Sequence, residues 1–404
     1  MKNIKKSILF LYCFLIISTI FLHNVKLLDI LTIPEGFYSN YSEIYEANNN
    51  KYFGDFVNMN IETNKVATDD KEPSEGYVIF KLFGFIPIRK VKVKILPSQE
   101  VYVGGNPIGM KVKSKGVVVV SDSIIDLESS TIEKNKILKN GDIILRINGQ
   151  DINSMEDIDK VLDYAENGRV VVDFKRDNKE QTKEITLLKN DENKYKLGVW
   201  VRDDFSGVGT LTFVRKDNFE FAALGHPVTN DKSENIIDIS DGQLYNCSLV
   251  GINKGYKNDP GELKCVFVQK NQEGNIIKNT KFGIYGYLNN TKNLIDTNLT
   301  ANLGGRLSVK PGKAKLISSV SGIREEYDIE IIKANYQSKS NDKSIIFRVK
   351  DKRLLELTGG IVQGMSGSPI MQNGKLIGAV THVFLSDPTK GYAVYSDWML
   401  EQMS

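Results

Sequence analysis

The 404-residue chain has few of the side chains that build metal sites and disulfide frameworks: only three histidines and three cysteines. No Cys/His cluster with zinc spacing is present, so we expect neither a metal nor a cofactor. Cys13 lies in an apolar N-terminal run, and Cys247 and Cys265 could pair outside the cytoplasm. Because a bridge cannot be deduced from sequence, both are treated as free thiols.

Net charge is also small. The chain carries +3 at neutral pH, which argues against a nucleic-acid partner, because such proteins usually present a basic face. The apolar fraction of 41% and the charged fraction of 25% are typical of globular proteins. A chain of this length is expected to form two or three domains.

One apolar run stands at the N-terminus, from Ser7 to Leu22, behind Lys2, Lys5 and Lys6. Lysines ahead of an apolar stretch orient it with the lysines in the cytoplasm. The run is slightly short for a span of about 20 residues, but no small-x-small cleavage site follows it. We therefore predict a signal-anchor within residues 1–30, with the remainder of the chain outside the cytoplasm.

Residues 31–99 are predicted to be a tether followed by leading strands. The first part is rich in Asn, Tyr, Glu and Asp and has weak periodicity. Strands are predicted from Tyr77 to Phe83 and from Val91 to Leu96, around a break at Gly84 and Pro87.

Residues 100–190 resemble a PDZ domain. The resemblance rests on the turn–strand–turn stretch from Gly141 to Gly149, followed by a helix that Asn153 or Ser154 would cap. In PDZ domains a peptide adds as a strand and its C-terminal carboxylate sits on a glycine loop. The resemblance places that peptide-binding loop at Pro107, Ile108, Gly109 and Met110.

Residues 191–404 contain many short strands separated by Gly and Asn turns, which predicts a barrel or sandwich. Within them, Ser366 stands in the small-residue stretch from Gly364 to Pro369, ahead of an Asn373-Gly374 hairpin turn. This stretch resembles the nucleophile loop of chymotrypsin-like peptidases, with Ser368 where those usually carry a second glycine. Backbone N–H groups of Gly364 and Ser366 would form the oxyanion hole.

A serine nucleophile needs a base, and His23 lies beside the apolar N-terminal run. The base is therefore His226 or His382. His226 follows an apolar strand that ends in small residues, as chymotrypsin-like peptidases present their base, and is favoured. His382 lies in the strand after the nucleophile loop, where it would contact substrate or pack.

Taken together, the segments around His226, around Ser366 and from Gly378 to Phe384 resemble the stage IV sporulation protein B peptidases. That family has a membrane segment, a PDZ domain and a serine peptidase domain, in this order. The resemblance implies a multi-domain protein with a mostly-β, double-barrel peptidase domain, and a triad of Ser366, His226 and Asp351. Asp238 and Asp241 are the rivals for the acid, because sequence spacing cannot say which carboxylate reaches the imidazole.

The resemblance also implies a role. Such a peptidase would be secreted from the forespore into the intermembrane space during endospore formation. It would cleave itself near its N-terminus, and it would cleave a membrane-bound regulator of an intramembrane protease that activates a late sigma factor. The alternatives are a catalytically silent PDZ scaffold at the membrane and a general envelope quality-control protease, although the latter type usually places its PDZ domain after the peptidase domain.

Overall fold

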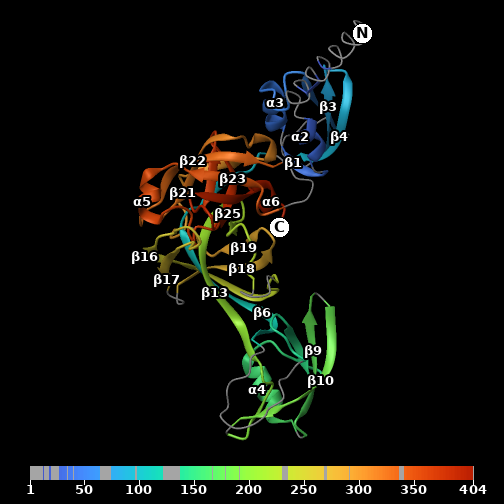
Figure 1. The fold of residues 1–404 in the computed structure, drawn as a ribbon, viewed down its shortest axis with the longest axis vertical. Helices are drawn as coiled ribbons and strands as arrows, with labels where there is room; N and C mark the ends of the chain where they lie inside the picture. Colours follow the sequence, from blue (N-terminus) through green and yellow to red (C-terminus); the bar gives the residue numbers. More distant parts are fainter. Residues whose placement is uncertain are drawn as a thin grey trace, which may run out of the picture.

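The protein has three lobes in the computed structural model (Figure 1). An upper lobe contains residues 27–95, a central lobe contains two β-barrels, and a lower lobe contains helix α4. The structure describes residues 12, 18–19, 27–33, 35–39, 41–63, 74–95, 98–121, 137–165, 167–177, 179–190, 192–229, 235–267, 271–290, 292–335 and 341–403.

The first barrel of the central lobe is a closed ring of six antiparallel strands around one apolar core. Its strands pair in the order β6 (Pro107–Ser121), β13 (Trp200–Arg215), β14 (Glu220–Ala223), β19 (Gly283–Leu288), β18 (Gln272–Thr280) and β15 (Ile239–Asn246). Closure leaves this sheet without a free edge.

The second barrel is likewise a closed ring of six strands. The order is β21 (Gly312–Ser318), β22 (Glu325–Ala334), β23 (Ile345–Val349), β26 (Lys390–Tyr395), β25 (Lys375–Val383) and β24 (Pro369–Gln372). Strands β5 (Glu100–Val103) and β20 (Thr300–Leu303) join the barrels, because β5 pairs with β13 and β20, and β20 pairs with β25. The predicted Asn373-Gly374 hairpin joins β24 to β25, with φ of 51° and 76° at its two residues.

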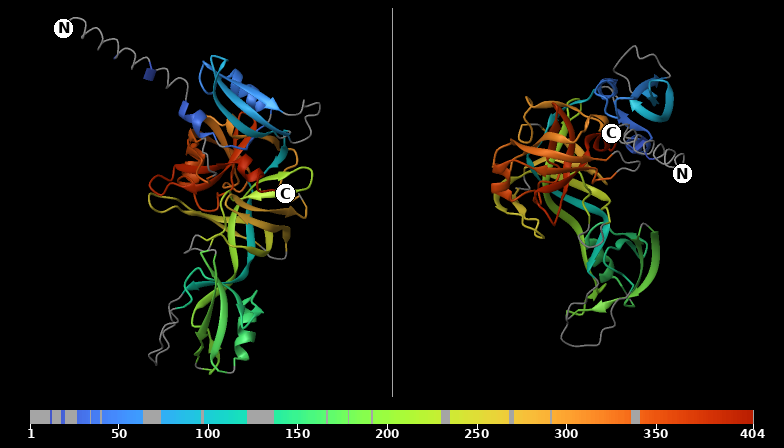
Figure 2. Two further views of the ribbon diagram at one scale, coloured as in Figure 1. Left: turned by 90° about the vertical axis from the view of Figure 1, so that its right-hand side faces the viewer. Right: turned by 45° about the horizontal axis from the view of Figure 1, so that its top comes forward.

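The lower lobe is inserted between two neighbouring strands of the first barrel. Strands β6 and β13 leave the barrel together and continue into this lobe, as Figures 1 and 2 show. The lower lobe also contains helix α4 (Met155–Asp163) and strands β7 (Ile143–Ile147), β8 (Gln150–Asp151), β9 (Arg169–Arg176) and β10 (Lys179–Thr186). Two further short strands of this lobe, β11 (Leu188–Lys189) and β12 (Tyr195–Lys196), pair with each other. Helix α4 begins after Ser154, whose hydroxyl accepts a hydrogen bond from Asp157 N at 3.2 Å.

This insertion corrects the predicted domain boundaries. Residues from Pro107 to Lys113 pair with β13 and β15 within the barrel, so the lower lobe does not begin at residue 100. At the other end, Leu197 is buried in the core of the lower lobe, beyond the predicted boundary at 190. Sequence order could not reveal that strands before and after the lobe are neighbours, because their pairing is long-range.

The predicted peptide-binding loop is also wrong. Pro107, Ile108, Gly109 and Met110 form a strand that is paired on both edges, and Gly109 lies opposite Val208 on β13 and Tyr245 on β15. With both edges hydrogen-bonded, this segment has no N–H groups left for a peptide carboxylate. Its glycine serves packing instead, since a Cβ at Gly109 would lie 2.3 Å from the ring of Phe267.

The upper lobe is a folded domain rather than the predicted tether. It contains a sheet in the order β1 (Phe37–Ser39), β4 (Ile86–Ile95), β3 (Ser74–Leu82) and β2 (Val57–Thr63), with helices α2 (Leu27–Thr32) and α3 (Tyr41–Asn49). The predicted leading strands correspond to β3 and β4. Helix α3 was missed because its buried face is small: Ile44 and Ala47 stand among polar residues.

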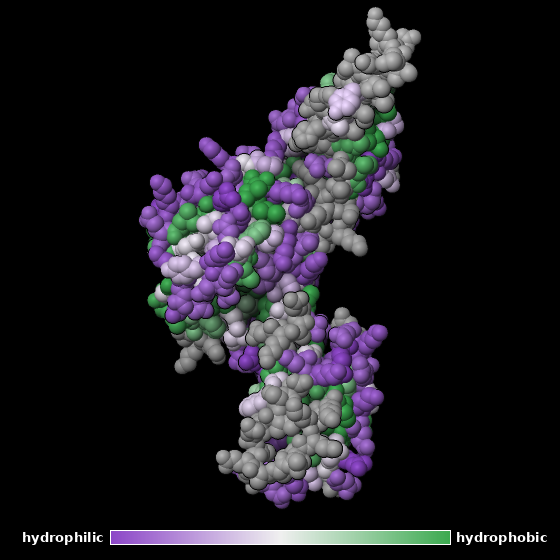
Figure 3. Space-filling view, in the orientation of Figure 1, coloured by the Kyte–Doolittle hydropathy of each residue, from purple (hydrophilic) through white to green (hydrophobic). Residues whose placement is uncertain are grey.

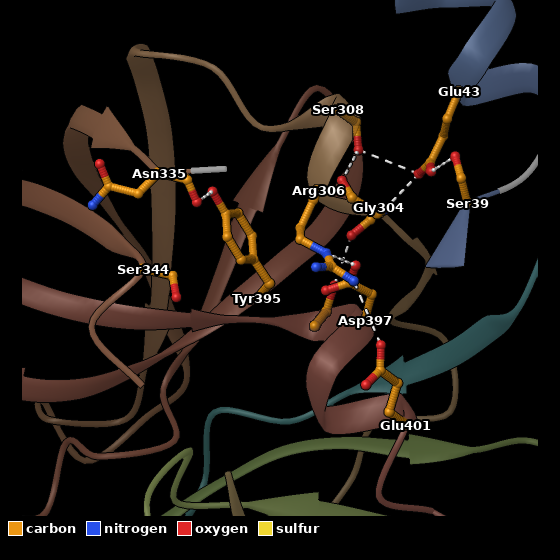
Figure 4. A network of polar contacts seen from close by, with 12 residues as sticks. Ser39, Glu43, Gly304, Arg306, Ser308, Asn335, Ser344, Tyr395, Asp397 and Glu401 are labelled. Carbon is orange, nitrogen blue, oxygen red and sulfur yellow. Dashed lines mark hydrogen bonds and ion pairs between the residues drawn. The ribbon is translucent and has the colours of Figure 1, made fainter. Parts of the chain in front are cut away.

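The upper lobe docks on the second barrel through a buried carboxylate (Figure 4). Glu43 of α3 accepts hydrogen bonds from Gly305 N at 2.6 Å and from Ser308 Oγ at 3.2 Å. Between these two partners, the short helix η1 (Arg306–Ser308) places Leu307 in the core of the upper lobe. Burial raises the pKa of Glu43.

Below this contact, Arg306 binds two more carboxylates. Its Nε donates to Asp397 Oδ2 at 2.6 Å, and its Nη2 donates to Glu401 Oε1 at 3.5 Å. Asp397 belongs to helix α6 (Ser396–Leu400), and Glu401 is the residue that follows this helix. Burial, followed by the charge of Asp397, raises the pKa of Glu401 to about 7. Three acidic groups therefore share one docking site, where Arg306 is the cation that directly bonds two of them.

The predicted signal-anchor falls almost entirely on residues outside those described. Among the residues that the structure does describe, no helix is long and apolar enough to cross a membrane. Cys247 is buried and Cys265 is half-buried, and both thiols are free.

Gly109→Asp is expected to destabilise the barrel by about 3 kcal/mol or more, because it places a charged side chain against Phe267 in a fully paired strand. Gly251→Asp is the matched control, since a Cβ there meets nothing closer than 3.9 Å. Chemical denaturation of both variants measures the difference. Equal stability of the two variants would show that Gly109 is not sterically required.

Glu401→Gln is expected to match the wild type at pH 4, below the ordinary carboxyl pKa of about 4.3, and to be more stable at pH 8. A carboxyl whose pKa is raised on folding stabilises the protein at low pH, and that contribution is lost as pH rises through the folded pKa, here about 7. Glutamine stays neutral throughout. Thermal unfolding at the two pH values measures this, and a constant offset between the proteins would contradict it.

Candidate active site

A cleft of about 560 Å³ lies between the two barrels. His226 reaches it from the end of β14 in the first barrel, whereas Ser366 and His382 come from the second barrel. The cleft is also lined by Met110 of β6 and Val208 of β13. The structure therefore brings the predicted nucleophile and both candidate bases together.

The loop that carries Ser366 is held by hydroxyl groups of the first barrel. Thr210 Oγ1 donates to Gly364 O at 2.8 Å, and Thr212 Oγ1 donates to Gly367 O at 2.8 Å. The Thr210 amide also donates to Ser366 O at 2.8 Å. Gly367 allows this close approach, because its φ is +94° and a Cβ there would lie 2.1 Å from Thr210 O.

The two predicted oxyanion donors are available. Gly364 has φ of +93°, and among the hydrogen bonds of the described residues none is donated by the backbone N–H of Gly364 or of Ser366. A backbone N–H left unpaired in a structure is unusual unless water or a ligand meets it. Both groups can therefore donate to a bound oxygen.

Of the two serines in the loop, only Ser366 faces the cleft. Its Oγ donates to Thr381 O at 3.0 Å, so it must rotate away from that carbonyl before it can donate to a histidine. Ser368 is completely buried, and its Oγ has no hydrogen-bond partner. A substrate carbonyl in the cleft can reach Ser366 but not Ser368.

His226 is presented by a strained turn at the end of β14. Leu224 and Gly225 both have φ of 72°, which is unusual for leucine and is found where a backbone is constrained by its surroundings. The His226 Nδ1 lies 2.9 Å from Pro227 O. Because a carbonyl only accepts, Nδ1 carries the proton, and Nε2 is the basic nitrogen. Burial lowers the pKa of His226, so the imidazole is neutral at neutral pH.

His382 lies next to His226, with ring centroids 5.2 Å apart. Its Nδ1 is 3.6 Å from Oδ2 of Asp342, in the loop between β22 and β23. Burial, followed by the neighbouring His226, lowers the pKa of His382 to about 4, whereas the charge of Asp342 opposes that shift. The cleft is therefore lined by two neutral imidazoles, and the Asp342 carboxylate lies next to one of them.

The structure does not bring Asp351 to the histidines. Asp351 caps helix α5 (Lys352–Thr358) by accepting from Arg353 N at 2.9 Å, and its other oxygen binds Arg353 Nη2 at 3.0 Å. Hydrogen bonds with Arg353 lower the pKa of Asp351. The rivals are elsewhere too: Asp238 pairs with Lys175 at 3.0 Å, and Asp241 binds Gln243.

Asp342 is not among the aspartates predicted from the sequence, which are Asp351, Asp238 and Asp241. It stands between Asn341 and Lys343 in a polar loop with no periodic pattern. No local signal distinguishes such a residue from a solvated surface charge. Within the described ranges, no group of three or more His, Cys, Asp or Glu side chains could hold a metal ion.

Comparison with known proteins decides the family. The model of the SpoIVB peptidase S55 family matches residues 193–400, more than half of the chain, and a PDZ domain model matches residues 107–187. The chain belongs to the SpoIVB peptidase S55 family. It is therefore a multi-domain, mostly-β serine peptidase with a PDZ domain, which implies protein substrates. No curated protein matches this chain.

Several solved structures are similar to parts of this SpoIVB-family peptidase. The PDZ domain of the SdrC-like protein from Listeria monocytogenes is 21% identical, with a TM-score of 0.18, and the match covers 22% of this chain and 90% of that one. GtR34C from Geobacillus thermodenitrificans is 34% identical, with a TM-score of 0.18, and the match covers 21% of this chain and 95% of that one. The Rv3671c protease from M. tuberculosis, in its active form, is 11% identical, with a TM-score of 0.27, covering 49% and 73%.

Ser366→Ala is expected to abolish labelling by a serine-reactive fluorophosphonate while leaving the melting temperature unchanged, because it removes only a cleft-facing hydroxyl. Ser368→Ala is the matched control in the same loop, and it should still be labelled. Mass spectrometry of the labelled peptide identifies the modified residue. Labelling of Ser366→Ala together with loss of labelling in Ser368→Ala would reverse the assignment.

Proposed function

We propose that this SpoIVB-family peptidase is a serine endopeptidase with Ser366 as nucleophile and His226 as general base. The observation that carries the proposal is the convergence of three groups in one cleft: the Ser366 hydroxyl, the His226 imidazole and the unpaired N–H groups of Gly364 and Ser366. They come from two barrels, as in chymotrypsin-like enzymes.

The chemistry is acyl transfer. His226 Nε2 takes the proton of the Ser366 hydroxyl as Oγ attacks a peptide carbonyl carbon. The carbonyl oxygen becomes an oxyanion, which accepts hydrogen bonds from Gly364 N and Ser366 N. His226 then gives its proton to the leaving amine, and water, deprotonated by His226, releases the acyl group from Ser366.

The proposed biological role is signalling during endospore formation, which follows the family. The N-terminal segment would anchor the enzyme with its folded domains outside the cytoplasm, in the space between the forespore membranes. Its substrates would be a membrane-bound regulator of an intramembrane protease and its own N-terminal region. Because β2, β3 and β4 are hydrogen-bonded within a sheet, self-cleavage is expected outside those strands.

The arrangement of the cleft favours this role over a catalytically silent PDZ scaffold. A scaffold has no use for unpaired N–H groups beside a serine, nor for a strained turn that presents a histidine to it. The PDZ domain would recruit a protein substrate and raise its local concentration, without taking part in bond cleavage. A quality-control protease with broad specificity is the remaining alternative, and substrate profiling distinguishes it.

The test is hydrolysis of a fluorogenic peptide library by the full chain in detergent micelles. His226→Ala is expected to lower kcat by about 10⁴-fold, the typical cost of losing a triad member. His382→Ala, at the neighbouring ring, should cost less. As pH falls, the wild-type kcat/KM should begin to decrease only below the ordinary histidine pKa of about 6.5, since burial lowers the pKa of His226. Normal turnover by His226→Ala would refute the proposed mechanism.

A further inference from the structure

His382 and the neighbouring Asp342 carboxylate take no part in the proton transfer between Ser366 and His226. His382 Nδ1 is buried and has no hydrogen-bond partner, yet it lies 3.6 Å from Asp342 Oδ2. Burying a polar nitrogen without a partner is costly, so such a group in a cleft points to an interaction that forms in another state. A small rotation of either side chain brings the nitrogen and the carboxylate into hydrogen-bond contact.

The loop around Asp342 is held in place. Its carbonyl oxygen accepts from Thr381 Oγ1 at 2.7 Å, so the loop is tied to the residue before His382. The neighbouring Lys343 amide donates to Asn341 Oδ1 at 3.0 Å. The carboxylate side chain is only 20% exposed, which weakens its screening by water. Asp342 is therefore aimed at the histidine pair rather than free in solvent.

The charges that act on the histidine pair are few. His382 is influenced by His226, Asp342 and Lys343, and among the described residues Asp342 is the charge that raises the pKa of His226. The rings are 5.2 Å apart, so a proton on one disfavours a proton on the other. When His226 takes the serine proton, a neutral His382 beside it and the negative charge of Asp342 lower the energy of the imidazolium.

We propose that the Asp342 carboxylate, which lies next to His382, stabilises the His226 imidazolium through its negative charge. Asp342 and His382 are positioning residues in this scheme, which rests on the proposed roles of Ser366 and His226. The tautomer of His226 is fixed separately by Pro227 O. The site then combines one serine, two histidines and one aspartate, and the Pro227 carbonyl orients His226 as the acid of a triad usually does.

The first test reads the histidines directly and needs no activity. In a Ser366→Ala background, the ring signals of His226 and His382 are titrated by NMR, which is simple in a chain with three histidines. Asp342→Asn should move the titration of both rings to lower pH, because the negative charge that raises their pKa is lost. Asp351→Asn is the matched control, and it should leave both titrations unchanged while lowering the melting temperature through loss of its helix cap.

The second test reads turnover. Asp342→Asn should lower kcat by about tenfold or more with KM within about twofold, and it should shift the acid limb of kcat/KM to lower pH. Asp342→Glu retains the negative charge and should return the acid limb of kcat/KM to its wild-type pH. Unchanged titrations and kcat in Asp342→Asn would overturn the inference, as would a shift of both rings in Asp351→Asn. Absence of wild-type hydrolysis would instead refute the proposed function, and the titrations would still decide which aspartate faces the pair.

Discussion

The architecture depends on one antiparallel ribbon, the pairing of β6 with β13. It runs from Trp200 opposite Ser121 in the lower lobe to Thr210 opposite Pro107 in the barrel. Because ladder hydrogen bonds fix the register, the ribbon sets the position of the PDZ domain relative to the barrel. Figure 3 shows the narrow waist that these strands cross. At the barrel end, Met110 and Val208 of the same ribbon line the cleft between the barrels, so the PDZ domain and the cleft share a continuous backbone.

The cleft itself depends on contact between the two barrels. Hydroxyl and amide groups of Thr210 and Thr212 hold the nucleophile loop, although the loop belongs to the second barrel. His226 follows the end of β14 in the first barrel. The distance between nucleophile and base is therefore set by barrel packing, and a shift of one barrel against the other would change it without breaking a strand.

The sequence predicted the parts of this peptidase whose signals are local. Gly and Ser around Ser366, the Asn373-Gly374 turn, and the capped helix after Ser154 are each specified within a few residues, and each is present. The multi-domain, mostly-β organisation followed from the same patterns. Long-range features were not predictable in this way. The insertion of the PDZ domain, the strand at Gly109 and the neighbourhood of His382 and Asp342 all depend on which distant strands pair.

The carboxylate shows the same limit at the level of one residue. Asp351 stands close to Ser366 in sequence, but it is the N-cap of helix α5 and forms an ion pair with Arg353. Asp342 stands in a featureless loop, and only the fold brings it to His382. The tether predicted for the first part of residues 31–99 is wrong for a related reason, because the upper lobe completes its core with Leu307, far along the chain.

The inserted lobe also has a consequence for the order in which the chain folds during synthesis. The PDZ core is complete once residues to Val201 have been made, whereas β5 must wait for β20 and the upper lobe must wait for Leu307. Elements with nearby partners form first, and loops closed over two hundred residues form late. The PDZ domain of a nascent chain can thus be folded well before Ser366 and His382 are made and join His226.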